Sequence, residues 1–201
     1  FMKTPVIAGL FNGNIKITDP FKKMAVEFDT RIDKFRFEGD SIGVINATGE
    51  YLAGPGSLNV NTISNNNLYN FTANFGYNPK DSVNQLSGSV VFNNSEIHIL
   101  EKYLDNIFSR IYGRATGKLS ISGTASDPKL TGSVRLDSTT MTVDYTRCRY
   151  ILNNNSVITF NPDEIDLGTI KIKDTLNHTA TLSGKIYHTF FDNFVFNELH
   201  L

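Results

Sequence analysis

The stretch GRATGKLSISG, residues 113–123, alternates small or apolar residues with polar ones at every second position. Successive side chains of a β-strand point to opposite faces, so the stretch predicts a strand with one apolar face and one polar face. Asp127-Pro128 then interrupts the pattern, because proline donates no hydrogen bond to a strand ladder. The alternation resumes over residues 130–137, and residues 141–145 predict a further strand.

The same two-residue period occurs elsewhere in the chain, over residues 34–38, 71–77, 86–92 and 179–186. Between Leu167 and Ile170 the apolar positions change parity, which one inserted residue explains, so we expect a β-bulge near Gly168-Thr169. Strands that follow one another through short polar turns predict an antiparallel meander rather than an alternation of strands and helices.

One segment has a different period. Its apolar residues are spaced by three and four: Ile97, Leu100, Leu104, Ile107, Phe108 and Ile111. This spacing predicts a single amphipathic helix near 96–111. The prediction divides the chain into an N-terminal block of strands at 1–93, the helix segment at 94–112 and a C-terminal block of strands at 113–201. Because no Pro/Ser-rich linker separates the blocks, we expect one continuous sheet system.

Composition narrows the class of protein. Of 201 residues, 40% are hydrophobic, which is enough to build a core and argues against disorder. The net charge of −1 gives no electrostatic signal for nucleic acid or for a polybasic membrane contact. The single cysteine excludes an intrachain disulfide. The chain starts at Phe1 and ends inside a strand-like segment, so we expect a fragment of a longer protein.

Residues that could carry chemistry do not converge on a pattern. The four histidines lack the spacing of zinc ligands, and the acidic cluster of Asp163, Glu164 and Asp166 lacks the loop that wraps calcium. Cys148 lies between two arginines, but no histidine is adjacent to it in sequence. No nucleotide-binding or nucleophile motif occurs. We therefore expect no enzyme, no metal site and no cofactor.

The apolar face of the strands is the informative feature. A β-sandwich would bury this face against a second sheet, whereas a curved sheet would leave a groove for an apolar ligand. The alternation of residues is the same in both cases, so both alternatives stay open at this point.

The C-terminal block resembles the C-terminal domain of the TamB family, the translocation and assembly module subunit of Gram-negative bacteria. The resemblance rests on the order of several elements after the helical segment, namely residues 113–124, the Asp127-Pro128-x-Leu130-x-Gly132 motif, and residues 143–145, 150–152, 157–160, 165–167 and 180–188. Residues 1–93 are similar only in having irregular alternating strands. The Asn-rich composition is similar to that of a Bacteroidota member of the family.

The resemblance implies an all-β fold, a long antiparallel curved sheet folded into an open trough (a β-taco) with the one helix. It implies a periplasmic part of an envelope-spanning protein, anchored in the inner membrane and reaching the outer membrane. Its implied roles are to carry phospholipid toward the outer membrane and to assist outer-membrane protein assembly. The implied partners are phospholipid acyl chains and an outer-membrane barrel of the Omp85 type, with no nucleic acid.

If the apolar stripe lines a lipid groove, its members in the C-terminal block are Leu119, Ile121, Leu130, Val134, Leu136, Met141, Val143, Leu182 and Ile186. The competing class is a structural or adhesive β-sandwich domain of a surface protein, with a closed core. A carbohydrate-active enzyme is a third class, and it is disfavoured because Trp is absent and the carboxylates are scattered.

Overall fold

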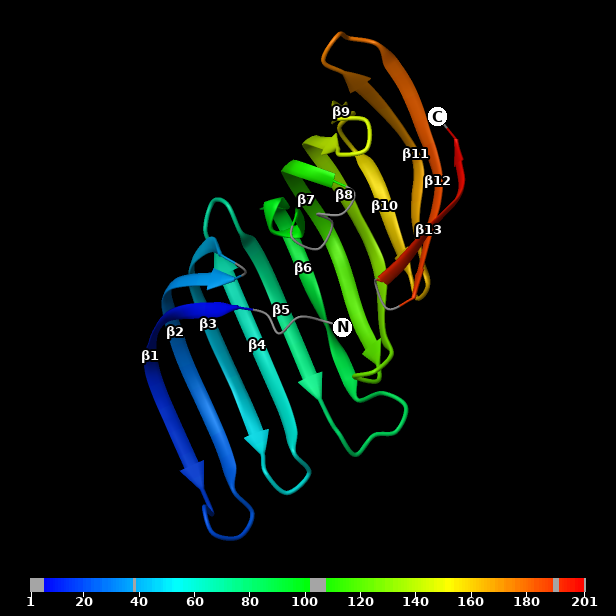
Figure 1. The fold of residues 1–201 in the computed structure, drawn as a ribbon. Helices are drawn as coiled ribbons and strands as arrows, with labels where there is room; N and C mark the ends of the chain where they lie inside the picture. The colour runs from blue at the N-terminus through cyan, green and yellow to red at the C-terminus, as the bar shows by residue number, and fades with distance from the viewer. Residues whose placement is uncertain (1–5, 38, 102–107, 190–191, 201) are drawn as a thin grey trace. The chain divides into compact units, whose positions relative to one another are not determined.

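A computed structural model describes residues 6–37, 39–101, 108–189 and 192–200. Antiparallel strands make up about three quarters of this part of the chain (Figure 1). The first six strands are β1 (Ile7–Thr18), β2 (Ala25–Phe37), β3 (Asp40–Leu52), β4 (Ser57–Asn65), β5 (Asn70–Tyr77) and β6 (Leu86–Glu96). A short 3-10 helix, η1 (His98–Leu100), precedes β7 (Phe108–Gly123), β8 (Pro128–Val143), β9 (Cys148–Leu152), β10 (Ser156–Asn161), β11 (Glu164–Asp174), β12 (Thr179–Thr189) and β13 (Asp192–His200).

The chain divides into two compact units. The first comprises residues 1–91 and 120–128, and the second comprises 92–119 and 129–201, so β6 and β7 contribute residues to both. Among the described residues, no helix is long and apolar enough to cross a membrane.

In the first unit, each strand from β1 to β5 pairs with the next one along the chain. Strand β2 shows why: Val26, Phe28 and Thr30 alternate with the charged Glu27 and Asp29, which gives the strand one apolar and one polar face. The buried hydrophobic residues of this unit are Ile32, Ile42, Ile45, Ala47 and Tyr69. Strand β1 stands at the end of the strand order, and all but one of its residues are exposed.

In the second unit, the strand order is β7-β8-β10-β11-β12-β13, and the short β9 pairs with both β8 and β11. One hydrophobic core unites these strands. Its buried members are Ile97, Ile111, Ala115, Val134, Leu136, Leu152, Leu167, Ile170, Ile172 and Ile186.

The predicted all-β, antiparallel fold class is confirmed, and so is the bulge near Gly168. The pairing of β11 with β12 shifts register between Asp166 and Thr169, and Gly168 adopts a left-handed conformation with φ of 57°. The backbone N–H of Gly168 donates to Oδ1 of Asp166 at 2.7 Å, which satisfies a group that the bulge removes from the ladder.

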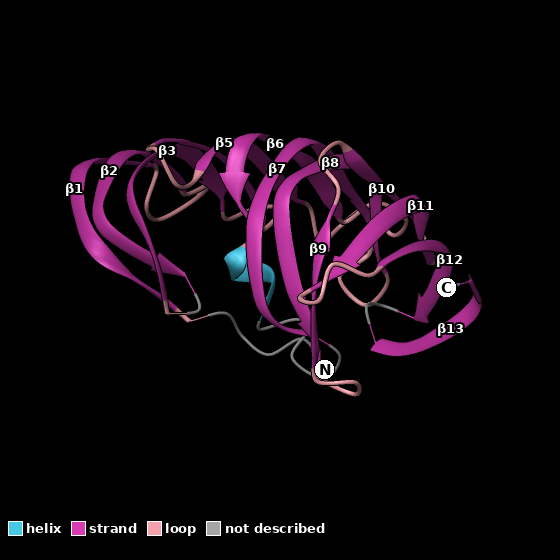
Figure 2. Ribbon diagram, turned by 90° about the horizontal axis from the view of Figure 1, so that it is seen from above, coloured by secondary structure: helices cyan, strands magenta, loops and turns pink. Residues whose placement is uncertain are grey.

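The predicted helix near 96–111 is wrong at both ends. Glu96 closes β6, the 3-10 helix spans only His98–Leu100, and Phe108 already begins β7 (Figure 2 shows the short helix in cyan). Residues 102–107, which the prediction includes, lie outside the described residues.

A bulged strand explains the misleading spacing. Arg110 adopts a left-handed conformation within β7, with φ of 52°. One such residue shifts the alternation by one position, so that Phe108 and Ile111, three residues apart, both pack on the same core. Spacing by three is therefore produced here by a strand and not by helical geometry.

The strand predicted at 141–145 is not a separate strand, and a further bulge explains the difference. Residues up to Val143 belong to the same strand, β8, as residues 130–137. Ser138 lies between them with φ of 51°, and its N–H donates to Oδ1 of Asn154 at 2.8 Å. The apolar positions change from even to odd numbers at this bulge, which makes one strand look like two.

Two glycines let neighbouring strands of the second unit approach closely. A Cβ atom on Gly132 would lie 2.2 Å from the carbonyl oxygen of Lys118, and the φ of Gly132 is 125°, which L side chains rarely adopt. A Cβ atom on Gly117 would lie 2.8 Å from Cα of Val134. Both contacts are with the adjacent strand. A side chain at either position would clash with that strand, which explains why glycine occurs there.

We predict that Gly132→Val destabilises the protein by about 2 kcal/mol or more, because the new side chain combines overpacking with backbone strain. Denaturant unfolding measures the effect. Gly54→Val is the matched control, because Gly54 lies in a turn where a Cβ atom would have no neighbour within 4 Å. Equal unfolding free energies for the two variants would contradict the prediction.

Candidate functional site

The apolar face of the second unit is largely closed. Its ten core residues are between 2% and 9% exposed, and they come from Ile97 and from strands β7, β8, β9, β11 and β12. Half-buried residues of β10, Ile158 and Phe160, pack against them. On a flat single sheet, the side chains of an uncovered face stay accessible to solvent. Burial this deep therefore requires the sheet to curve, so that side chains of the same face cover one another.

The nine predicted groove residues fall into three groups by their burial and by their contact with the core. Val134, Leu136 and Ile186 are members of the buried core. Leu119, Met141 and Leu182 are half-buried and pack against that core. Ile121, Leu130 and Val143 are half-buried but do not belong to it, and Ile121 falls in the first unit. Six of the nine are therefore brought together by the structure.

The apolar face of the first unit is more open, and its residues are aligned in rows across the strands. The registers place Ile15, Phe28, Gly49, Val60 and Phe75 in one row over β1 to β5. Ile15 is 67% exposed and Phe75 is 38% exposed. The Phe28 ring lies over Gly49, since a Cβ there would be 2.4 Å from Cζ of Phe28.

A row of small side chains runs beside this row. Its members, one from each strand from β1 to β5, are Gly13, Thr30, Ala47, Thr62 and Ala73. Residues two apart on a strand are separated by roughly 6.7 Å, so the rows on either side of the small residues lie about two such steps apart. Small side chains therefore lie between rows of larger ones, and Ala47 among them is only 7% exposed.

Beyond the small row, the first unit closes. Ser64 is fully buried, and its hydroxyl donates to the carbonyl oxygen of Tyr69 at 2.5 Å. The side chain of Asn66 organises the turn between β4 and β5, since its Nδ2 donates to Ser64 and to the carbonyl of Ile42, and its Oδ1 accepts from the backbone N–H of Tyr69 at 2.6 Å. The open part of the face is therefore bounded at one end by a hydrogen-bonded turn whose flanking residues, Ser64 and Tyr69, are buried.

The rows of the first unit were missed as groove residues by sequence reasoning, which placed every lining residue in the C-terminal block. The signal was present, because Phe71, Ala73, Phe75 and Tyr77 alternate in the same way. Their exposure, which distinguishes them from the core of the second unit, has no local signature in the sequence.

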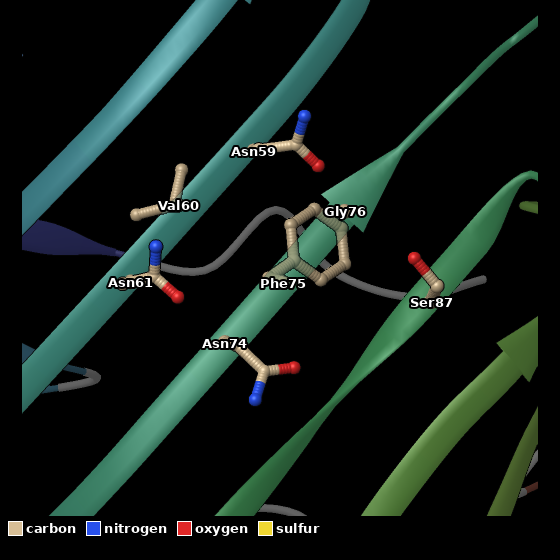
Figure 3. Close-up of a pocket in the computed structure, with 7 residues that line it drawn as sticks. All are labelled: Asn59, Val60, Asn61, Asn74, Phe75, Gly76 and Ser87. Atoms are coloured by element: carbon tan, nitrogen blue, oxygen red, sulfur yellow. The ribbon is translucent and has the colours of Figure 1, made fainter.

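A pocket lies on strands β4, β5 and β6, and Val60 and Phe75 of the apolar row are among its lining residues (Figure 3). Its polar side chains are Asn59, Asn61, Asn74 and Ser87. Gly76 opens it, because a Cβ there would lie 2.6 Å from Oγ of Ser87. No ionisable side chain lines this pocket, so the groups that acid–base catalysis needs are not part of it.

Charged side chains pair at the ends and on the polar face of the strands. Lys185 contacts Glu164 at 3.0 Å, and this hydrogen bond raises the pKa of Lys185. Lys129 contacts Asp163 at 2.9 Å. Among the described residues, no group of three or more potential ligands could hold a metal ion.

His188 continues the apolar positions of β12 beyond Ile186 and is only 5% exposed. Its backbone N–H donates to the carbonyl oxygen of Asp163 at 3.1 Å. Burial lowers the pKa of His188 from the ordinary 6.5, with the Asp163 carboxylate opposing this shift and Lys129 adding to it. The apolar face therefore ends in a histidine that favours its neutral form.

Comparison with known proteins agrees with this geometry. The family model described as the TamB C-terminal domain matches residues 2–173. No curated protein and no solved structure matches the chain.

We predict that His188 makes the fold sensitive to mild acid. Because its pKa is lower in the folded state, the unfolded chain binds the proton more readily, and stability falls as pH decreases through about 6.5. His188→Asn removes this contribution and flattens the dependence of the unfolding free energy between about pH 7 and pH 5. His200→Asn, at an exposed position, leaves the wild-type slope, and equal slopes in all three proteins would contradict the prediction.

Proposed function

The chain belongs to the TamB C-terminal domain family, and we propose on that premise that its apolar face carries phospholipid acyl chains. The family has a general role in outer-membrane assembly or lipid transport, in the bacterial envelope, with lipids and an Omp85-type partner. The apolar side chains of the strands would perform the lipid part of that role.

One observation supports the proposal above others: the aligned rows on the open apolar face of the first unit. An acyl chain is a narrow, unbranched apolar ligand, and a row of small residues from Gly13 to Ala73 offers it a path across five strands. Phe75, 38% exposed, flanks this row and would contact the chain.

The free energy of such binding comes from removing methylene groups from water. Each buried CH₂ contributes about 0.8 kcal/mol, so a long acyl chain gains enough to leave water without any specific hydrogen bond. A charged or zwitterionic headgroup would remain in water beside the open face, because burying it unpaired is costly. Transfer of this kind requires no catalytic residue, and we propose that the chain is not an enzyme.

The longer protein that we propose for this chain would be anchored in the inner membrane and reach the outer membrane. Apolar faces in series would then form an open trough along which phospholipid moves to the outer membrane. The full-length protein would also contact the Omp85-type barrel. Lipid supply and barrel assembly would then occur at the same place. The nine predicted residues of the C-terminal block, from Leu119 to Ile186, would line the lipid path of that block.

A closed core with a structural or adhesive role is the second candidate function. The deep burial of ten residues in the second unit favours it. In that case the apolar side chains of the second unit pack only on one another, and lipid does not reach them.

We predict that photo-reactive residues on the apolar face crosslink to phospholipid in cells. The test places them at positions 75 and 182 of the full-length protein, with positions 74 and 183, on the opposite face, as matched controls. Adducts at 75 and 182 but not at the controls support the groove in both units. Adducts at 75 alone restrict lipid to the first unit, and no adduct at either, in a protein that still complements a deletion, overturns the proposal.

We also predict that Ala73→Phe reduces lipid adducts at position 75 at least tenfold, because the ring fills the row of small residues. Thr72→Phe is the control, since it introduces the same side chain at an adjacent, exposed position on the polar face. Both variants are compared by thermal unfolding, so that lost stability is separated from a blocked path. Equal adduct yields in two folded variants would contradict a path over Ala73.

A further inference from the structure

We propose that the turn between β1 and β2 docks this chain on the surface of an anionic phospholipid bilayer. The residues that carry the contact, Phe21, Lys22 and Lys23, belong to no row of the apolar face, although Ile15 of β1 belongs both to a row and to the exposed strip behind the turn.

The turn presents an aromatic side chain to solvent. Phe21 is 97% exposed, in the segment Asp19-Pro20-Phe21-Lys22-Lys23. The N–H of Lys22 donates to the carbonyl oxygen of Asp19 at 3.1 Å, and Pro20 has its φ fixed by its ring, so the turn is held in shape without contacts to the Phe21 ring. Transfer of such an exposed apolar side chain from water into an apolar phase is favourable in free energy.

Strand β1 extends the apolar surface away from the turn. Ile17 is 57% exposed, Ile15 67% and Phe11 64%. These residues share one face of the strand, since they lie opposite Val26, Phe28 and Ile32 of β2. The hairpin therefore offers one exposed aromatic residue at its tip and a strip of exposed apolar residues behind it.

Within the turn segment, residues 19–23, the charges are positive on balance, and Glu50 of β3, opposite Glu27, lies beyond this segment. Lys22 and Lys23 are both exposed and face a single carboxylate within the turn, that of Asp19. The next charges along the hairpin, Lys16 and Glu27, neutralise each other at 3.2 Å. Lysines beside an aromatic residue suit a bilayer interface, where the ring enters the acyl boundary and the ammonium groups reach anionic headgroups.

Another exposed turn of the same unit lacks this combination. Val83 is 67% exposed between β5 and β6, but it lacks an aromatic ring. The nearby Lys80 donates from Nζ to the carbonyl oxygen of Gly54 at 2.9 Å, and Asp81 balances its charge. This turn therefore provides a control at which an apolar residue is exposed without a basic pair.

Vesicle co-sedimentation of the 201-residue chain tests the proposal. The probes are vesicles of phosphatidylcholine mixed with phosphatidylglycerol, and vesicles of phosphatidylcholine alone. We expect Phe21→Ser to weaken binding to the anionic vesicles about tenfold, from the loss of one buried ring. The double variant Lys22→Gln, Lys23→Gln should reduce the preference for anionic vesicles about 25-fold, at about fivefold for each lysine. Val83→Ser should bind as the wild-type chain does.

Wild-type binding that is absent, or that is equal for Phe21→Ser and Val83→Ser, overturns the proposal. Binding without preference for phosphatidylglycerol overturns it as well, because the lysines would then have no role. The outcome is independent of the groove: Phe21→Ser should leave the lipid adduct at position 75 unchanged when vesicle binding falls. Conversely, Ala73→Phe should lose the lipid adduct at position 75 and keep vesicle binding. That result would test the groove and not the docking turn.

Discussion

Backbone pairing in antiparallel strands is the constraint on which the rest of this structure depends. It fixes each side chain on one of two faces, so that alternation in the sequence becomes one apolar face and one polar face. Within the first unit, strands β1 to β5 follow one another in a single sheet order. The face must then be buried by curvature or remain accessible, and the two units differ in this respect: the second buries Ile170 and Val134, whereas the first leaves Phe75 and Ile15 exposed.

The strands could be predicted from sequence because alternation is a local property. The bulge at Gly168 could also be predicted, since glycine tolerates the left-handed conformation and the parity change falls within one apolar run. The bulges at Arg110 and Ser138 could not, because neither residue type marks such a conformation. Arg110 in particular brings Phe108 and Ile111 to one face at a spacing of three, which is indistinguishable in sequence from a turn of helix.

The candidate site could be predicted only in part, for a related reason. Alternation assigns a residue to the apolar face, and Val134, Leu136 and Ile186 are all on it, but it does not give the depth of burial. Depth depends on how strongly the sheet curves, and curvature depends on bulges and on close approaches such as those at Gly117 and Gly132. The row of small residues from Gly13 to Ala73 requires the registers of four strand pairs, which no single segment of sequence contains.

The nearest-neighbour order of β1 to β5 has an evolutionary consequence. Each of these strands pairs only with those beside it in sequence, so one hairpin can be duplicated or deleted while the registers of the others are kept. Such a change moves the ends of the sheet apart or together by two strand widths, roughly 9.5 Å. A lineage could therefore adjust the reach of the domain in steps of one hairpin, without redesigning a core.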